Sequence, residues 1–188
     1  MPDPTGRHRA SPDAERRVKA TAPSRTEPAP GRDSTLQSMI DGHKLRSVDP
    51  IPRYQQELIN QCGETIAGAE AANTKSAKVA FNAAYDAMRL AVDAHMNATG
   101  YRVESGEGGH AHRVRYAELA MSDVLSAEDV AFYRAARAVR HRTEYPQPNE
   151  QLQVDTKAAN EAIKVAKRFH KAVSGVLKPK TAEPKTNT

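Results

Sequence analysis

The most constraining feature of this sequence is the recurrence of apolar residues every three or four positions along several long segments. Within residues 74–98 this stripe consists of Phe81, Tyr85, Met88, Val92 and Met96. An α-helix turns by about 100° per residue, so this spacing places the five side chains on one face and predicts a buried helix. Residues 51–71, which begin beside a proline, predict another helix with the apolar stripe Leu58, Cys62, Ile66 and Ala69.

Three further helices are predicted after these two. One covers 110–122, and a second covers 127–145, where Ser126 followed by Asp129 resembles a capping box. The third, 149–177, has lysines over much of one face and the following residues on its apolar face: Ala159, Ala162, Ile163, Ala166, Phe169, Val173 and Val176. Because aromatic residues make up only 5% of the chain and tryptophan is absent, we predict an all-α fold, an antiparallel helical bundle of about five helices.

The predicted helices fall in one domain, residues 35–178. Residues 1–34 hold six of the twelve prolines and almost no bulky apolar side chain. Such a segment cannot bury enough surface to offset the entropy of ordering, so we predict a disordered tail. Residues 179–188 are predicted to form a second tail.

Composition narrows the functional classes. The single cysteine, Cys62, excludes an intramolecular disulfide and a multi-cysteine zinc site, and its place on an apolar stripe predicts a buried, unreactive thiol. No segment approaches the ~18 apolar residues of a membrane span, and no apolar signal-peptide core opens the chain. We therefore expect a cytoplasmic protein without a membrane partner. The formal net charge of +5 favours polyanionic partners.

A glycine-rich loop, "ESGEGGHAH", precedes the helix at 110–122. It has neither the lysine nor the spacing of a phosphate-binding P-loop. His110 and His112 lack an acidic partner at ligand spacing and make a weak metal site, so we expect no metal or cofactor and interpret the loop as a helix start. His95 is interpreted as a hydrogen-bonded structural histidine, and Gly100 as a helix cap in the left-handed conformation.

The densest polar cluster is "RAARAVRHRTEYP", which ends at Pro146. In steps of about 100° per residue, one face of this helix carries Phe132, Ala135, Ala136 and Val139. The other face carries Arg134, Arg137, His141, Glu144 and Tyr145, with Arg140 on a flank beside Tyr133. Cations near a helix C-terminus also compensate the helix dipole, but that role would not require a histidine and a tyrosine in line with them. We predict that the functional surface is Arg137, Arg140, His141 and Tyr145.

Three segments, "FNAAYDAMRLAVDAHMNATGYRV", "GGHAHRVRYAEL" and "YRAARAVRHRTEYP", resemble the HEPN domains (higher eukaryotes and prokaryotes nucleotide-binding). The resemblance covers roughly residues 50–177 and is greatest to the actinobacterial and toxin–antitoxin-like branches of that superfamily. It implies a helical bundle, commonly a homodimer in which the arginine helices face each other. Many HEPN domains are metal-independent ribonucleases, and the resemblance points to toxin–antitoxin or phage-defence systems.

The HEPN ribonuclease motif, Arg-Asn-x-x-x-His, matches residues 140–145 with two departures: His141 replaces the asparagine and Tyr145 replaces the histidine. Tyrosine is a poorer general base than histidine at neutral pH, which counts against ordinary cleavage in this register. A looser family spacing, an arginine followed after four to six residues by a histidine, is met by Arg134 and His141. In that register His141 would activate the ribose 2′-hydroxyl, and Arg134 or Arg137 would stabilise the phosphorane.

Three hypotheses stay open. The first is an RNA-binding or RNA-cleaving protein with catalytic residues His141, Arg140, Arg137 and Tyr145, and with RNA bound by Arg134, Arg137, Arg140 and Arg142. The second is a non-catalytic dimer that binds an antitoxin or another protein, with Glu144 paired to an arginine across the interface. The third is a helical scaffold whose basic face keeps it soluble. Arginine and tyrosine serve both catalysis and interfaces, so residue type does not separate the first two.

Overall fold

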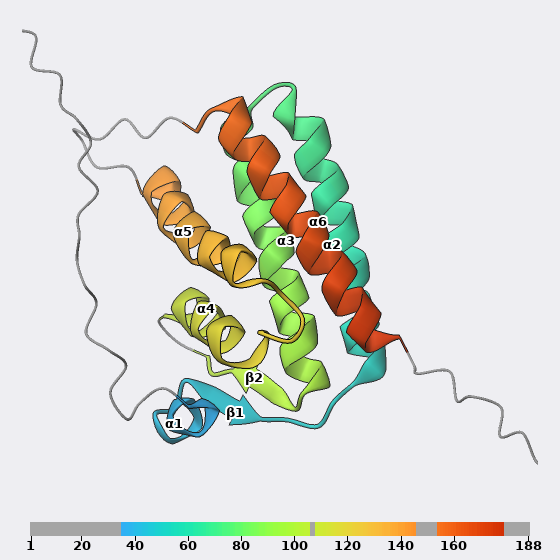
Figure 1. The fold of residues 1–188 in the computed structure, drawn as a ribbon, viewed down its shortest axis with the longest axis vertical. Helices are drawn as coiled ribbons and strands as arrows, with labels where there is room; N and C mark the ends of the chain where they lie inside the picture. The colour runs from blue at the N-terminus through green and yellow to red at the C-terminus, as the bar shows by residue number, and fades with distance from the viewer. Residues whose placement is uncertain (1–34, 106–107, 146–153, 179–188) are drawn as a thin grey trace, which may run out of the picture.

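The computed structural model describes residues 35–105, 108–145 and 154–178 (Figure 1). The predicted tails, 1–34 and 179–188, lie outside the described residues. The described chain forms the helices α1 (Leu36–Asp41), α2 (Pro52–Asn73), α3 (Ala77–Ala98), α4 (Gly109–Ala120), α5 (Ala127–Glu144) and α6 (Thr156–Leu177), with the short strands β1 (Leu45–Ser47) and β2 (Tyr101–Val103). The predicted all-α helical bundle is confirmed. None of the described helices is long and apolar enough to cross a membrane.

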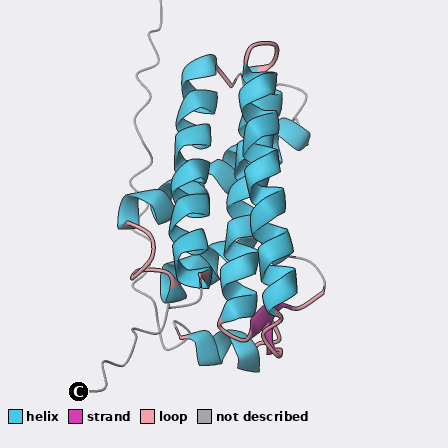
Figure 2. Cartoon of the chain, turned by 90° about the vertical axis from the view of Figure 1, so that its right-hand side faces the viewer, coloured by secondary structure: helices cyan, strands magenta, loops and turns pink. Residues whose placement is uncertain are grey.

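Three long helices, α2, α3 and α6, lie side by side and form the main layer of the bundle (Figures 1 and 2). A turn at residues 74–76 reverses the chain between α2 and α3, so these two helices are antiparallel. The predicted stripes of α2 and α3 are buried throughout. The predicted stripe of α6 is buried as far as Val173, whereas Val176 is 50% exposed, because it lies in the last turn beyond the core.

Helices α4 and α5 pack against α3 on the side away from α2 (Figure 1). Aromatic rings join these helices to the main layer. Tyr133 of α5 is fully buried, with its ring centroid 5.4 Å from that of Tyr85 in α3 and 5.5 Å from that of Phe169 in α6. This cluster holds α5 against both long helices.

Side-chain caps begin four of the described helices, and those of α5 and α6 bear on the sequence predictions. Ser126 accepts a hydrogen bond from the Asp129 amide, which confirms the predicted start of α5. The Asp129 carboxylate does not complete a capping box but pairs with Arg168 of α6 at 2.7 Å. Helix α6 begins at Thr156, where Asp155 caps it by accepting from the Ala158 amide, and residues 149–153 of the predicted helix lie outside the described residues.

A small sheet closes one end of the bundle (Figure 2). Strands β1 and β2 pair antiparallel, with Leu45 opposite Val103 and Ser47 opposite Tyr101. The sheet and α1 were not predicted from the sequence. Gly100, between α3 and β2, has a φ of +83°, which confirms the predicted left-handed cap.

A buried polar network lies at the C-terminal end of α3. The His95 ring is 4% exposed, and its Nδ1 lies 2.8 Å from the Tyr116 hydroxyl, which lies 2.6 Å from Oγ1 of Thr99. Burial lowers the pKa of His95 and raises the pKa of Tyr116 to about 12. The interpretation of His95 as a structural histidine is thereby confirmed.

Candidate functional site

Helix α5 is rotated relative to the sequence prediction. Ala135, expected in the core, is exposed, and Phe132 and Val139 are only partly buried. The buried positions are instead Asp129, Val130, Tyr133, Ala136 and Thr143. The large ring of Tyr133 fills the space against α3 and α6, so Tyr133 faces the core. The residues that follow it on the same helix face, Ala136, Arg140 and Thr143, face the core as well. The side chain of Arg140 is only 18% exposed.

A cavity of about 290 Å³ opens where the C-terminal half of α5 meets the start of α4. We call it the α4–α5 pocket. One wall is the beginning of α4, residues 108–111, and Tyr85 of α3 also lines it. The other wall comes from α5 and consists of Arg137, Arg140, His141, Glu144 and Tyr145. The structure therefore brings together the four residues predicted as the functional surface, whereas Arg134 and Arg142 lie outside the pocket lining.

Arg140 is held in place by two carboxylates. Its Nη1 lies 2.8 Å from Glu144 one turn further along α5, and its Nη2 lies 3.3 Å from Asp86 of α3. The guanidinium carbon also stands 5.4 Å from the centroid of the Tyr85 ring, within cation–π range. The charge of Arg140 is already compensated, so this residue shapes the pocket wall and is a poor free anchor for an anion.

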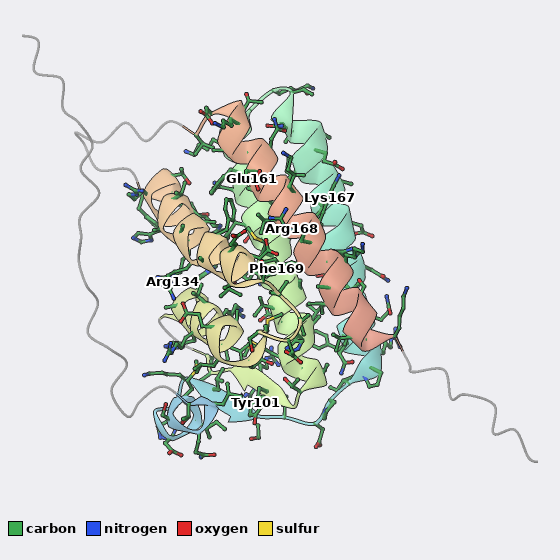
Figure 3. The ribbon with its side chains drawn as sticks, viewed as in Figure 1. Tyr101, Arg134, Glu161, Lys167, Arg168 and Phe169 are labelled. Carbon is green, nitrogen blue, oxygen red and sulfur yellow. The ribbon has the colours of Figure 1, made fainter. Side chains whose placement is uncertain are left out.

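Arg137 is the uncompensated cation of the pocket. It is exposed, it lines the cavity, and it forms no ion pair with any residue that the structure describes. Arg134, one turn earlier, is also exposed, but it does not line the pocket, and it pairs with Glu118 at the place where α5 approaches α4 (Figure 3). Of these two predicted RNA-binding arginines, only Arg137 is in position to bind a ligand in the pocket.

Two histidines line the pocket from opposite walls. His141 is exposed on α5, with its ring centroid 5.3 Å from that of Tyr145, which is 65% exposed at the helix end. His110 stands in the first turn of α4, and its Nδ1 lies 3.0 Å from the Tyr85 hydroxyl. Burial lowers the pKa of His110, and the positive charges of Arg140 and nearby arginines lower it further.

The start of α4 adds partial positive charge to the pocket. Gly108 precedes the helix with a φ of +81°, a conformation that favours glycine, and no side chain caps the helix. The amides of the first turn have no acceptor within the helix, and the helix dipole makes this end positive. Combined with Arg137, this arrangement favours an anionic group in the pocket.

Two contributors to the pocket, His110 and Tyr85, were not assigned to it from the sequence. His110 was considered only as a weak metal ligand, and Tyr85 only as a core residue. The glycine-rich start of α4, which offers no capping side chain, was the available signal for an anion site. Among the described residues, no group of three or more His, Cys, Asp or Glu side chains could hold a metal ion.

No protein-family model matches this chain, and neither a curated protein nor a solved structure is significantly similar to it. The fold and the pocket define a helical-bundle protein in which two arginines, two histidines and one glutamate line a single cavity.

Proposed function

We propose that this protein binds an RNA strand through the α4–α5 pocket, which takes one phosphodiester group, and that it cleaves the strand there without a metal ion. The observation that carries the proposal is the convergence on one cavity of three features: Arg137, which has no ion-pair partner among the described residues, the uncapped start of α4, and the imidazoles of His110 and His141. The resemblance to HEPN domains and the net charge of +5 support RNA as the polyanion.

Each part has a chemical role. Arg137 is a donor for the phosphate oxygens and for the charge that develops on a phosphorane. An imidazole can accept or donate a proton near neutral pH, so His141 can act on the ribose 2′-hydroxyl or on the leaving oxygen. Tyr145 stands at the rim, where its exposed ring offers a surface for a base to stack on.

The test uses two oligonucleotides of one sequence. A 2′-O-methyl RNA, which cannot be cleaved through its 2′-oxygen, measures binding by fluorescence anisotropy at several salt concentrations. The unmodified RNA measures cleavage by pure protein in EDTA, with DNA of the same sequence as the control. We expect salt-sensitive binding, cleavage of RNA but not of DNA, and loss of cleavage in His141→Ala. A protein that fails to bind the 2′-O-methyl RNA even at low salt refutes the proposal.

A second candidate function is a non-catalytic homodimer that serves as an interaction module for an antitoxin or another protein. The exposed Tyr145 and Arg137, which line the same pocket, favour it, because tyrosine and arginine are enriched among the residues that dominate protein interfaces. The predicted pairing of Glu144 across such an interface is not required, since Glu144 is bound by Arg140 of its own helix. If this reading is correct, Arg137→Ala and Tyr145→Ala dissociate the complex, and neither the parent nor the variants cleave RNA.

A further inference from the structure

We infer that His110 is a second catalytic residue of the α4–α5 pocket, the general base that takes the proton of the ribose 2′-hydroxyl while His141 acts as the acid. The inference rests on the proposed function and goes beyond it, because it assigns the two proton transfers to two imidazoles on different helices.

The position of His110 is fixed by its neighbours. Its Nδ1 lies 3.0 Å from the hydroxyl of Tyr85, and the two rings stack with centroids 5.8 Å apart. Tyr85 is itself fully buried, and the guanidinium carbon of Arg140 and the ring centroid of Tyr133 each lie 5.4 Å from its own ring centroid. A general base must be held at the correct distance and orientation to the proton that it removes, and the contact with the buried Tyr85 holds His110 in one position.

The contact with Tyr85 occupies Nδ1 of His110, and we take the tautomer in which this nitrogen carries the proton. When Nδ1–H donates to the Tyr85 oxygen, Nε2 of His110 carries the lone pair. No described residue is hydrogen-bonded to Nε2. His110 thus pairs one anchored nitrogen with one that is available to a ligand in the pocket.

The surroundings of His110 favour the neutral form of its imidazole. Burial and the positive charges of Arg140, Arg113 and Arg89 lower the pKa of His110, with Asp86 acting in the opposite direction. The groups around it come from three helices: Tyr85, Asp86 and Arg89 of α3, Arg113 of α4, and Arg137 and Arg140 of α5. A neutral imidazole is the form that a general base requires at neutral pH.

With these roles, the ribose 2′-oxygen displaces the 5′-oxygen at phosphorus, and the reaction needs no other reagent. The 2′-oxygen attacks the phosphorus as its proton passes to Nε2 of His110, and Arg137 stabilises the charge on the phosphorane. The bond from phosphorus to the 5′-oxygen breaks, and that oxygen takes a proton from the imidazolium of His141. The products are a 2′,3′-cyclic phosphate and a 5′-hydroxyl. His110 then releases its proton to water, and His141 takes up a proton from water, so both imidazoles return to their starting states.

The test compares His110→Asn with His112→Asn. Both replace a histidine of α4 by the same residue, but His112 does not line the pocket. Cleavage in EDTA is measured from about pH 5 to about pH 9, and binding is measured with the 2′-O-methyl RNA. We expect His110→Asn to cleave about 100- to 10,000-fold more slowly and to lose the acidic limb of the pH profile. It should bind within about threefold of the parent, and His112→Asn should match the parent in rate and in profile.

Any other result from a folded His110→Asn variant counts against the inference. Cleavage by His110→Asn at the parent rate, with the acidic limb retained, overturns it, and so does a parent that binds RNA but does not cleave it. A parent that does not bind RNA refutes the proposed function as well. Should His110→Asn fail to fold by circular dichroism, Tyr85→Phe replaces it. That variant removes only the anchoring hydroxyl and is expected to slow cleavage without weakening binding, whereas cleavage at the parent rate would overturn the inference.

Discussion

Replacing Arg137 by alanine tests which arginine of α5 binds phosphate. Arg134 is a matched control, because it lies one turn away on the same helix, is also exposed and carries the same charge. The two residues differ in their surroundings: Arg134 is paired with Glu118, whereas Arg137 lines the pocket and has no ion-pair partner among the described residues. A difference between the two alanine variants therefore reports on the pocket and not on the charge of the helix.

The expected magnitude follows from these contacts. A hydrogen bond to a charged group contributes about 1.5–3 kcal/mol, and about 1.4 kcal/mol corresponds to a tenfold change in Kd. Arg137→Ala should therefore weaken RNA binding about 10- to 100-fold. Losing one phosphate contact should also reduce the slope of log K against log salt by about 0.7 for a single strand. Arg134→Ala should change Kd by less than about threefold, since its charge is already compensated on the surface.

The assay is fluorescence anisotropy with a labelled 2′-O-methyl RNA at four or more salt concentrations, with thermal unfolding as a check that both variants are folded. Equal losses of affinity and equal slopes for Arg134→Ala and Arg137→Ala would mean that α5 attracts RNA only through its total charge. That result would refute the assignment of Arg137 as the phosphate-binding residue of the pocket.

Three further predictions concern stability, reactivity and assembly. Burial lowers the pKa of His95, so as pH falls below about 6.5 the unfolded chain binds a proton that the folded chain does not. The Tm measured by circular dichroism should therefore be lower at about pH 5 than at about pH 7, and His95→Gln should reduce this difference. An unchanged difference in His95→Gln would contradict the assignment. Burial raises the pKa of the Cys62 thiol to about 12, so a disulfide reagent should label Cys62 only after unfolding, and rapid labelling of the native protein would contradict this. The resemblance to HEPN domains predicts a homodimer at micromolar concentration, and a monomer by light scattering would count against it.

The long helices could be predicted because their apolar stripes repeat at the helical period over many turns, as at Phe81, Tyr85 and Met88. The sheet could not, since strands of three residues, such as Leu45–Ser47, are too short to show an alternating pattern. The rotation of α5 was also missed. Whether Phe132 or Tyr133 faces the core depends on the shape of α3 and α6, which the sequence of α5 does not contain.

The candidate site was predictable only in part. Residues on one helix face could be grouped by their spacing, so Arg137, His141 and Tyr145 were correctly placed together. The state of Arg140 could not be inferred, because its partner Asp86 lies 54 residues away in the sequence. The same holds for His110, which reaches the pocket only because α4 packs against α5.

The central claim is that one phosphodiester group binds in the α4–α5 pocket between His110 and His141. The most direct measurement is NMR of the histidine imidazoles during titration with a 2′-O-methyl dinucleotide, with signals assigned through single-histidine variants. The signals of His110 and His141 should shift together with one Kd, while those of the exposed His43 and the buried His95 should not move. If His110 and His141 stay unchanged, or if His43 shifts as much as they do, the pocket is not the binding site and the account is wrong.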